Sequence, residues 1–244
     1  MSQGSSLWSD AWRRLLANKA AVAGGIILLI LIFLAIFAPW IAPHSYSYQN
    51  LELGAQPPSG NFLLGTDTLG RDLFSRILYG ARVSLLVGFV ATGVALVIGV
   101  SWGIIAGYFG GRIDSVMMRI VDVLYGLPFI IFIILLMVIF GRNIWLLFGA
   151  IGAVEWLTMA RIVRGQVLTI KNQEYVLAAQ AMGVTNIQMF RKHIFPNILG
   201  PIAVYATLTI PQVMLLEAFL SFLGLGIQPP MSSWGTLIRY GVES

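Results

Sequence analysis

AAVAGGIILLILIFLAIFAPWIA, residues 20–42, is a run of 23 consecutive positions without a charged side chain. A helix needs about 20 predominantly apolar residues to cross the hydrocarbon core of a bilayer. The run is also longer than the roughly 7–15 apolar residues of a cleavable signal peptide. It therefore predicts a transmembrane helix that remains in the protein as an anchor.

The composition of the whole chain supports a membrane location. Of its 244 residues, 58% are hydrophobic and only 10% are charged, whereas soluble domains carry about 25% charged residues. So few charges cannot cover a surface that faces water. The net charge of +5 is not gathered into a basic patch with stacking aromatic side chains, so we expect no nucleic-acid partner.

Four further apolar stretches follow the first one. They are residues 83–111, residues 123–141, residues 143–160, which are interrupted only by Glu155, and about 198–223, which carry Glu217. The sequence therefore predicts an all-α membrane protein with five visible transmembrane helices.

The distribution of Lys and Arg predicts the orientation. A cytoplasmic N-terminus places ten of these residues in inner segments and five in outer ones, and positive residues accumulate on the cytoplasmic side. The expected organisation is a cytoplasmic segment at 1–19 and a transmembrane domain at 20–244. The outer loop is about 43–81 and the inner loop about 165–197.

The outer loop is predicted to end in a helix that lies at the membrane surface. Leu69, Leu73, Ile77 and Leu78 follow one another at helical spacing and share one apolar face.

The inner loop predicts a helix, a glycine turn and a second short helix. Tyr175, Ala178, Ala179 and Met182 share one helical face, and Gly183 can adopt the left-handed conformation of a turn. The second helix is marked by Ile187, Phe190 and Ile194 and is expected to end at Pro196. Exposed small and apolar residues in such a loop indicate a surface that a partner covers. The alternative is an amphipathic helix resting on lipid headgroups.

The inner loop resembles the coupling loop of ABC importer permeases. The family pattern is E-A-A, three residues, G, nine residues, I-x-L-P, and Ala178, Ala179, Gly183 and Pro196 match it. The departures are Leu177 for the family's Glu, His193 for its Ile and Phe195 for its Leu. The loss of that Glu means that its charge contact cannot be transferred to this chain.

Three other stretches are similar to the dipeptide, oligopeptide and nickel branch of these permeases, above all to its C-type oligopeptide permease. They are GTDTLGRDLFSRILYGARVSL (65–85), RIDSVMMRIVDVLYGLP (112–128) and FLSFLGLGIQPPMSSWG (219–235). The resemblance implies six core helices. Because the sequence ends at Ser244, where the sixth should begin, we expect a truncated chain.

The resemblance also implies the partners and the coupling site. A second homologous permease, two ATPase subunits, an extracytoplasmic peptide-binding protein and membrane lipid are expected in a bacterial cytoplasmic (inner) membrane. The residues expected to contact the ATPase are Glu174, Tyr175, Ala178, Ala179, Gly183, Arg191 and Pro196.

Two residues of the fifth span are candidates for the substrate pathway. A carboxylate inside a span is costly and therefore a functional candidate, which indicates Glu217, and Gln212 lies five residues before it. The structural alternative is that Glu217 forms hydrogen bonds across the bundle with Ser, Thr or Gln side chains, such as Thr209 or Gln212. For Glu155 we expect an ion pair with Arg161 or Arg164.

The chain carries no motif for chemistry of its own. None of its three lysines follows a glycine, so there is no P-loop, and neither an HExxH motif nor a cysteine is present. We therefore expect no catalytic residue, no metal site and no cofactor in this chain, with ATP and Mg²⁺ bound by the partner ATPases. The predicted function is peptide import. The alternatives are a nickel or glutathione importer and an ion-coupled transporter that uses Glu155 or Glu217.

Overall fold

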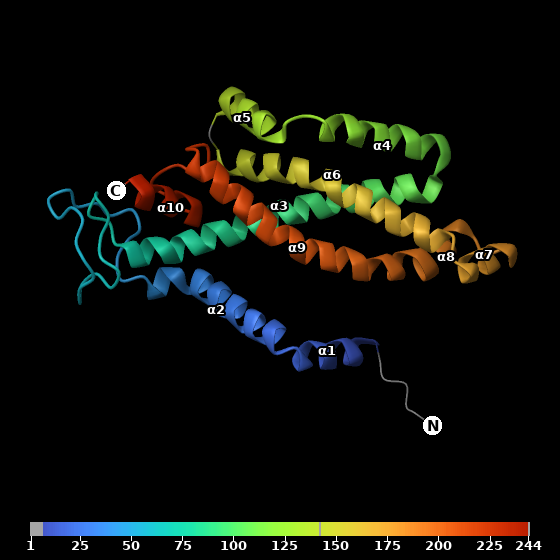
Figure 1. Ribbon diagram of the computed structural model, residues 1–244, viewed down its shortest axis with the longest axis horizontal. Coiled ribbons are helices and arrows are strands. Elements are labelled where there is room, and N and C mark those ends of the chain that lie inside the picture. Colours follow the sequence, from blue (N-terminus) through green and yellow to red (C-terminus); the bar gives the residue numbers. More distant parts are fainter. Residues whose placement is uncertain (1–6, 142, 244) are drawn as a thin grey trace. The chain divides into compact units, whose positions relative to one another are not determined.

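The computed structural model describes residues 7–141 and 143–243, and every named element in these ranges is a helix (Figure 1). The chain divides into two compact units, Met1–Val83 and Ser84–Ser244. The α-helices are α1 (Leu7–Ala17), α2 (Lys19–Ile41), α3 (Leu73–Phe109), α4 (Gly111–Tyr125), α5 (Phe129–Phe140), α6 (Ile144–Lys171), α7 (Glu174–Ala181), α8 (Asn186–Met189), α9 (Phe195–Phe222) and α10 (Trp234–Glu243).

Four of the predicted spans are confirmed as long apolar helices. Helices α2, α3 and α6 are long and apolar enough to cross a membrane, and so is the continuous helical stretch 186–222, which contains α8 and α9. The Asn18 side chain caps α2 by accepting from the backbone N–H groups of Ala20 and Ala21 at 3.1 and 3.2 Å. That cap satisfies donors that the start of any helix leaves without a partner.

The third predicted span, 123–141, is not a single straight helix. Helices α4 and α5 meet at a bend of 78°, so this span is broken. Pro128 has no backbone N–H and restricts the residue before it, which ends a helix at this point. After the break, α5 has only 12 residues.

The prediction of a separate surface helix before the second span was wrong. Helix α3 begins at Leu73 and continues without a break to Phe109. Residues 73–81 are its first turns, and Leu78 and Ala81 on them are buried. The apolar spacing was read correctly as helical, but no residue between 81 and 83 interrupts the helix.

The loop between α2 and α3 is ordered by the partly buried carboxylate of Asp67. Asp67 accepts from the backbone N–H groups of Leu69 and Arg71 at 2.9 and 3.0 Å, and its ion-pair partners are Arg71 and Arg76. Burial alone acts to raise the pKa of Asp67, but the hydrogen bonds and charge of Arg71 and the charge of Arg76 together hold that pKa below its ordinary value. Arg71 and Arg76 thus share one carboxylate, which ties the loop to the first turn of α3.

Asp67→Asn is expected to loosen this loop. A hydrogen bond to a charged group contributes about 1.5–3 kcal/mol, so backbone amides of residues 67–71 should exchange at least about tenfold faster, as measured by hydrogen exchange at neutral pH. The wild-type protection is fully present above the ordinary carboxyl pKa of 3.8 and is lost as the pH falls below it. Glu52→Gln, an exposed change in the same loop, is the control; equal exchange in the two variants would contradict the assignment.

The second unit is held together by a close contact between α3 and α6. Gly99, Gly103 and Gly107 lie one turn apart on α3. A Cβ atom added at these positions would lie 2.7 Å from the Trp156 oxygen, 2.5 Å from the Ala160 oxygen and 3.0 Å from the Arg164 oxygen, respectively. Small residues at every fourth position allow two helix backbones to approach closely. The backbone of α6 occupies the space that side chains on this face of α3 would need.

Gly103→Ala should therefore destabilise the protein, because the added methyl group overlaps the backbone of α6. Overpacking of this kind costs about 1–3 kcal/mol, and the expected result is a lower midpoint of thermal unfolding in detergent. Gly93→Ala on the same helix is the matched control, since nothing lies within 4 Å of a Cβ atom at that position. Equal midpoints for the two variants would contradict the close contact.

Candidate functional site: an exposed helix–turn–helix and a pocket at the helix break

A helix–turn–helix follows α6 at the end of the second unit opposite α10 (Figure 1). Gly183 adopts φ +79°, and its N–H donates to the Gln180 oxygen at 3.0 Å. The next N–H, of Val184, donates to the Ala179 oxygen at 3.2 Å, and Thr185 caps α8. This geometry confirms the predicted turn, because a positive φ favours glycine.

One face of the helix–turn–helix is part of the protein core. Val176, Ala179, Met189 and Ile194 are buried in a cluster with apolar side chains of α6. Ala179, which was predicted to contact a partner, therefore packs inside this chain. The segment is also held by polar contacts, since the Tyr108 hydroxyl donates to the Asn186 oxygen at 2.9 Å. The position of α7 is thus fixed by α3 and α6.

The opposite face of the segment is exposed and largely apolar. Tyr175 is 45% exposed and Met182 is 78% exposed. The other exposed residues on α7, the turn and α8 include Glu174, Leu177, Ala178, Gly183 and Ile187. Exposed apolar side chains on a rigidly held element indicate a surface that another molecule covers.

Pro196 does not end the second short helix as predicted. Residues Phe190–Ile194 form a π-helical segment, and α9 begins directly after it at Phe195. Proline is accepted in the first turn of a helix, where its missing N–H has no partner to lose. Arg191 and Pro196 are both exposed. The helix–turn–helix is thus joined to the fifth span without a loop.

Two ion pairs connect α4 to α6. Arg164 donates to both carboxylate oxygens of Asp114 at 2.5 and 2.6 Å. Arg161 donates to Asp122 at 2.8 Å and lies over the Tyr125 ring at 4.1 Å from its centroid. The prediction that these arginines pair with Glu155 was wrong.

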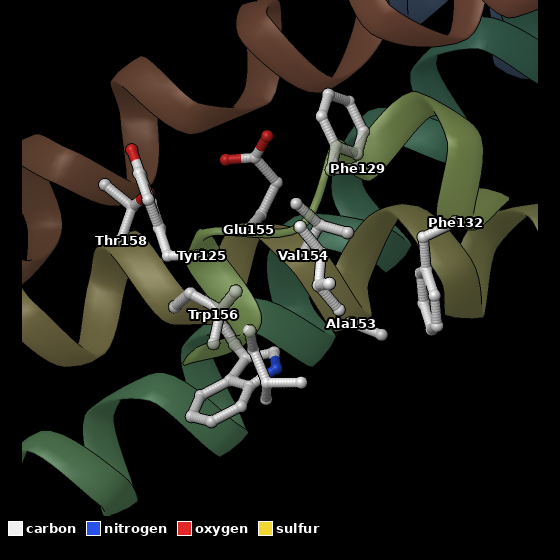
Figure 2. Close-up of a pocket in the computed structure, with 11 residues that line it drawn as sticks. Tyr125, Phe129, Phe132, Ala153, Val154, Glu155, Trp156 and Thr158 are labelled. Carbon is white, nitrogen blue, oxygen red and sulfur yellow. The ribbon is translucent and has the colours of Figure 1, made fainter. Parts of the chain in front are cut away.

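Glu155 instead faces a pocket at the break between α4 and α5. The pocket has a volume of about 520 Å³, and in Figure 2 the carboxyl group projects between Tyr125 and Phe129. Its lining includes Leu124, Tyr125, Leu127, Phe129, Phe132, Val154, Glu155, Trp156 and Thr158. Within 7–141 and 143–243 no hydrogen-bond donor reaches the Glu155 carboxylate. The sequence does not predict this pocket, although Gly126 and Pro128 mark the helix break that forms it.

Glu217 is fully buried among the described residues. The Ser221 hydroxyl donates to one of its oxygens at 2.5 Å and the Ser84 hydroxyl to the other at 3.4 Å, while the Trp234 N–H donates to Ser84 at 3.1 Å. The carboxylate therefore joins α3, α9 and the start of α10. Serine donors thus confirm the predicted hydrogen bonding within the bundle. The two examples named for it do not contribute, because Thr209 donates to the Tyr205 oxygen and Gln212 is exposed.

These features define a multi-pass membrane protein with an exposed helix–turn–helix at one end of its second unit. Residues 99–242 match the family described as binding-protein-dependent transport system inner membrane component, and residues 6–58 match the N-terminal TM domain of oligopeptide transport permease C. The chain therefore belongs to the family of binding-protein-dependent inner-membrane permeases.

Named relatives are similar along nearly the whole chain. The dipeptide transport system permease protein DppC of Bacillus subtilis is 51% identical over 98% of this chain and 75% of its own length. The oligopeptide transport system permease protein OppC of Haemophilus influenzae is 50% identical over 98% and 78%. The OppC protein of Escherichia coli K12 is 48% identical over 99% and 81%.

Glu217→Ala is expected to act on stability. It leaves the hydroxyl groups of Ser84 and Ser221 without their acceptor in a buried place, at a cost of about 1–3 kcal/mol. The thermal unfolding midpoint in detergent should fall, and transport should fall only in proportion to the amount of folded protein. Gln212→Ala, an exposed change on the same helix, should leave the midpoint unchanged. A normal midpoint with lost transport in Glu217→Ala would instead support the pathway role.

Proposed function

We propose that this chain is a membrane-spanning subunit of an ATP-driven importer that moves peptides across the bacterial cytoplasmic membrane. The proposal combines family membership with one structural observation, the exposed apolar surface on α7 and its glycine turn. The relatives named as dipeptide and oligopeptide permeases support a peptide substrate. Those names do not favour the nickel, glutathione or ion-coupled alternatives.

The exposed face of α7 is the surface that contacts a separate ATPase subunit. We define it by Glu174, Tyr175, Ala178, Met182 and Gly183, all of which are exposed. Small and flexible apolar side chains can fit against a partner groove, in the way that a helix docks through an apolar face. Two ATPase subunits bind ATP and Mg²⁺ and supply the energy, because this chain has no P-loop.

The orientation follows the positive-inside rule. With the N-terminus in the cytoplasm, the α7 surface faces the cytoplasm, where ATP is present, and ten of the fifteen Lys and Arg residues lie on that side. The ordered loop that contains Asp67 then faces outwards, where an extracytoplasmic binding protein delivers the peptide. A second, homologous permease completes the pathway between the two subunits.

Motion of the ATPase reaches the spans through two rigid connections. The buried face of α7 packs on α6, and α8 continues through the π-helical segment into α9. A π-helical turn is a less regular part of a helix and is frequent at functional sites. Displacement of α7 therefore moves α6 and α9 together, which can switch the pathway between two states if the ATPase binds them differently.

Gly183→Trp tests the coupling surface. A bulky side chain at the turn is expected to lower ATP-dependent peptide uptake by about tenfold or more in proteoliposomes, because it displaces the ATPase from α7. A tenfold loss of binding corresponds to about 1.4 kcal/mol. The matched control is Gly141→Trp, at the other end of α6, which also has a positive φ (+84°) and open space around its Cβ position.

Both variants place a bulky side chain at a glycine with positive φ, so a loss confined to Gly183→Trp reports docking and not a general effect of backbone strain. The amount of ATPase that copurifies with the permease is the second measurement, and it should fall for Gly183→Trp alone. Normal uptake and normal copurification in Gly183→Trp would refute the proposed coupling surface.

A further inference from the structure

We propose that the pocket at the α4–α5 break is a peptide-binding site in which Glu155 binds the protonated amino terminus of the substrate. The inference rests on the proposed import of peptides and adds to it a recognition site within the permease itself. None of the named relatives or matched families assigns such a site to this position.

The carboxylate lacks a partner of its own among the described residues. The two neighbouring cations on α6 are already occupied, since Arg161 pairs with Asp122 and Arg164 pairs with Asp114. Lys171, further along α6, donates to the Tyr108 oxygen at 2.6 Å. A half-buried carboxylate in an apolar environment carries a desolvation cost unless a cation or donor meets it. The Glu155 side chain therefore offers an acceptor to a cation from outside the chain.

The pocket has the size and the lining of a small-molecule site. Its volume of about 520 Å³ falls in the range of roughly 300–1,000 Å³ that is typical of ligand pockets. Most of its lining is apolar or aromatic, and Glu155 is the one carboxylate named in it. Apolar walls with a single fixed charge suit a ligand that combines a cationic group with variable, largely apolar side chains. A short peptide with a free ammonium group has this chemistry.

The Glu155 carboxylate, on the continuous helix α6, lies beside a neighbouring segment whose helical backbone is interrupted. Helix α4 ends at Tyr125 and α5 begins at Phe129, and the two are bent by 78°. Irregular backbone at membrane depth is tolerated where it is buried in protein or lines a cavity, and transporters place binding sites at such breaks. The break opens the pocket beside α6, and Figure 2 shows the carboxyl group of Glu155 directed into it.

The test uses the assembled complex of both permeases and both ATPases in lipid nanodiscs, without the binding protein, so that selection by that protein is removed. Radiolabelled tri-alanine and N-acetyl-tri-alanine are the probes, because acetylation removes only the ammonium charge. The wild-type complex is expected to bind tri-alanine at least tenfold more tightly than N-acetyl-tri-alanine. Glu155→Gln should abolish that preference by weakening tri-alanine alone, and Glu155→Asp should retain part of it. Glu52→Gln, which removes an exposed carboxylate from the α2–α3 loop, should leave the preference unchanged.

Three results would overturn the inference. The first is no preference, or no tri-alanine binding, in the wild-type complex. The second is a preference that persists in Glu155→Gln. The third is weaker assembly of the two permeases in Glu155→Gln with an equal loss for both peptides, which would assign Glu155 to an ion pair with the partner permease.

ATP-dependent uptake by the complete system, with the binding protein present, separates this inference from the proposed function. If tri-alanine is taken up but binding shows no Glu155-dependent preference for it over N-acetyl-tri-alanine, only the proposed binding site is refuted. If no tested peptide is taken up in an ATP-dependent way, the proposed function itself is refuted.

Discussion

The close approach of α3 and α6 is the contact on which the rest of the second unit depends. Gly99, Gly103 and Gly107 remove side chains from one face of α3, and the backbone of α6 lies in that space. In lipid, helices gain little from hiding apolar surface, so close packing of this kind carries much of the association. Because α6 is held in this way, it positions the ion pairs to α4, the pocket beside Glu155 and the buried cluster under α7.

The same helix connects the exposed apolar face of α7 with the pocket beside Glu155. Helix α6 carries Glu155 in its middle and the two paired arginines six and nine residues later, and the α7 segment follows its end. The arginines hold α4 at the side of the pocket, and the buried face of α7 rests on the last turns of α6. A displacement applied to α7 therefore acts on the element that also positions the pocket.

Much of this fold could be predicted from the sequence, because bilayer thickness sets the length of a spanning helix and lipid excludes charge. The turn at Gly183 was also predictable, because this glycine lies between two apolar helical segments and can adopt the positive φ that a turn needs. The helix ends were harder. Nothing local distinguishes a surface helix at 73–81 from the first turns of α3, and Pro196 stops a helix or starts one depending on what precedes it. The break at Pro128 was visible in the sequence, but its 78° angle depends on tertiary packing.

The particular partners of the two membrane carboxylates could not be predicted from the sequence. Glu217 meets serine hydroxyls inside the fold, whereas Glu155 pairs with neither Arg161 nor Arg164 and faces a pocket. The sequence places both carboxylates inside apolar spans, where the free-energy cost of burying a charge makes each a candidate for function. What separates them is the supply of donors from distant segments. Glu217 accepts hydrogen bonds from the hydroxyl of Ser221 on its own helix and from that of Ser84 on α3, a residue 133 positions earlier in the sequence. Glu155 has arginines six and nine residues ahead of it, but these are drawn to aspartates on α4. A carboxylate whose donors come from within the fold stabilises the fold, whereas one left facing a cavity is available to a substrate. That distinction depends on which helices pack against one another, and the spacing of residues along the sequence does not reveal this.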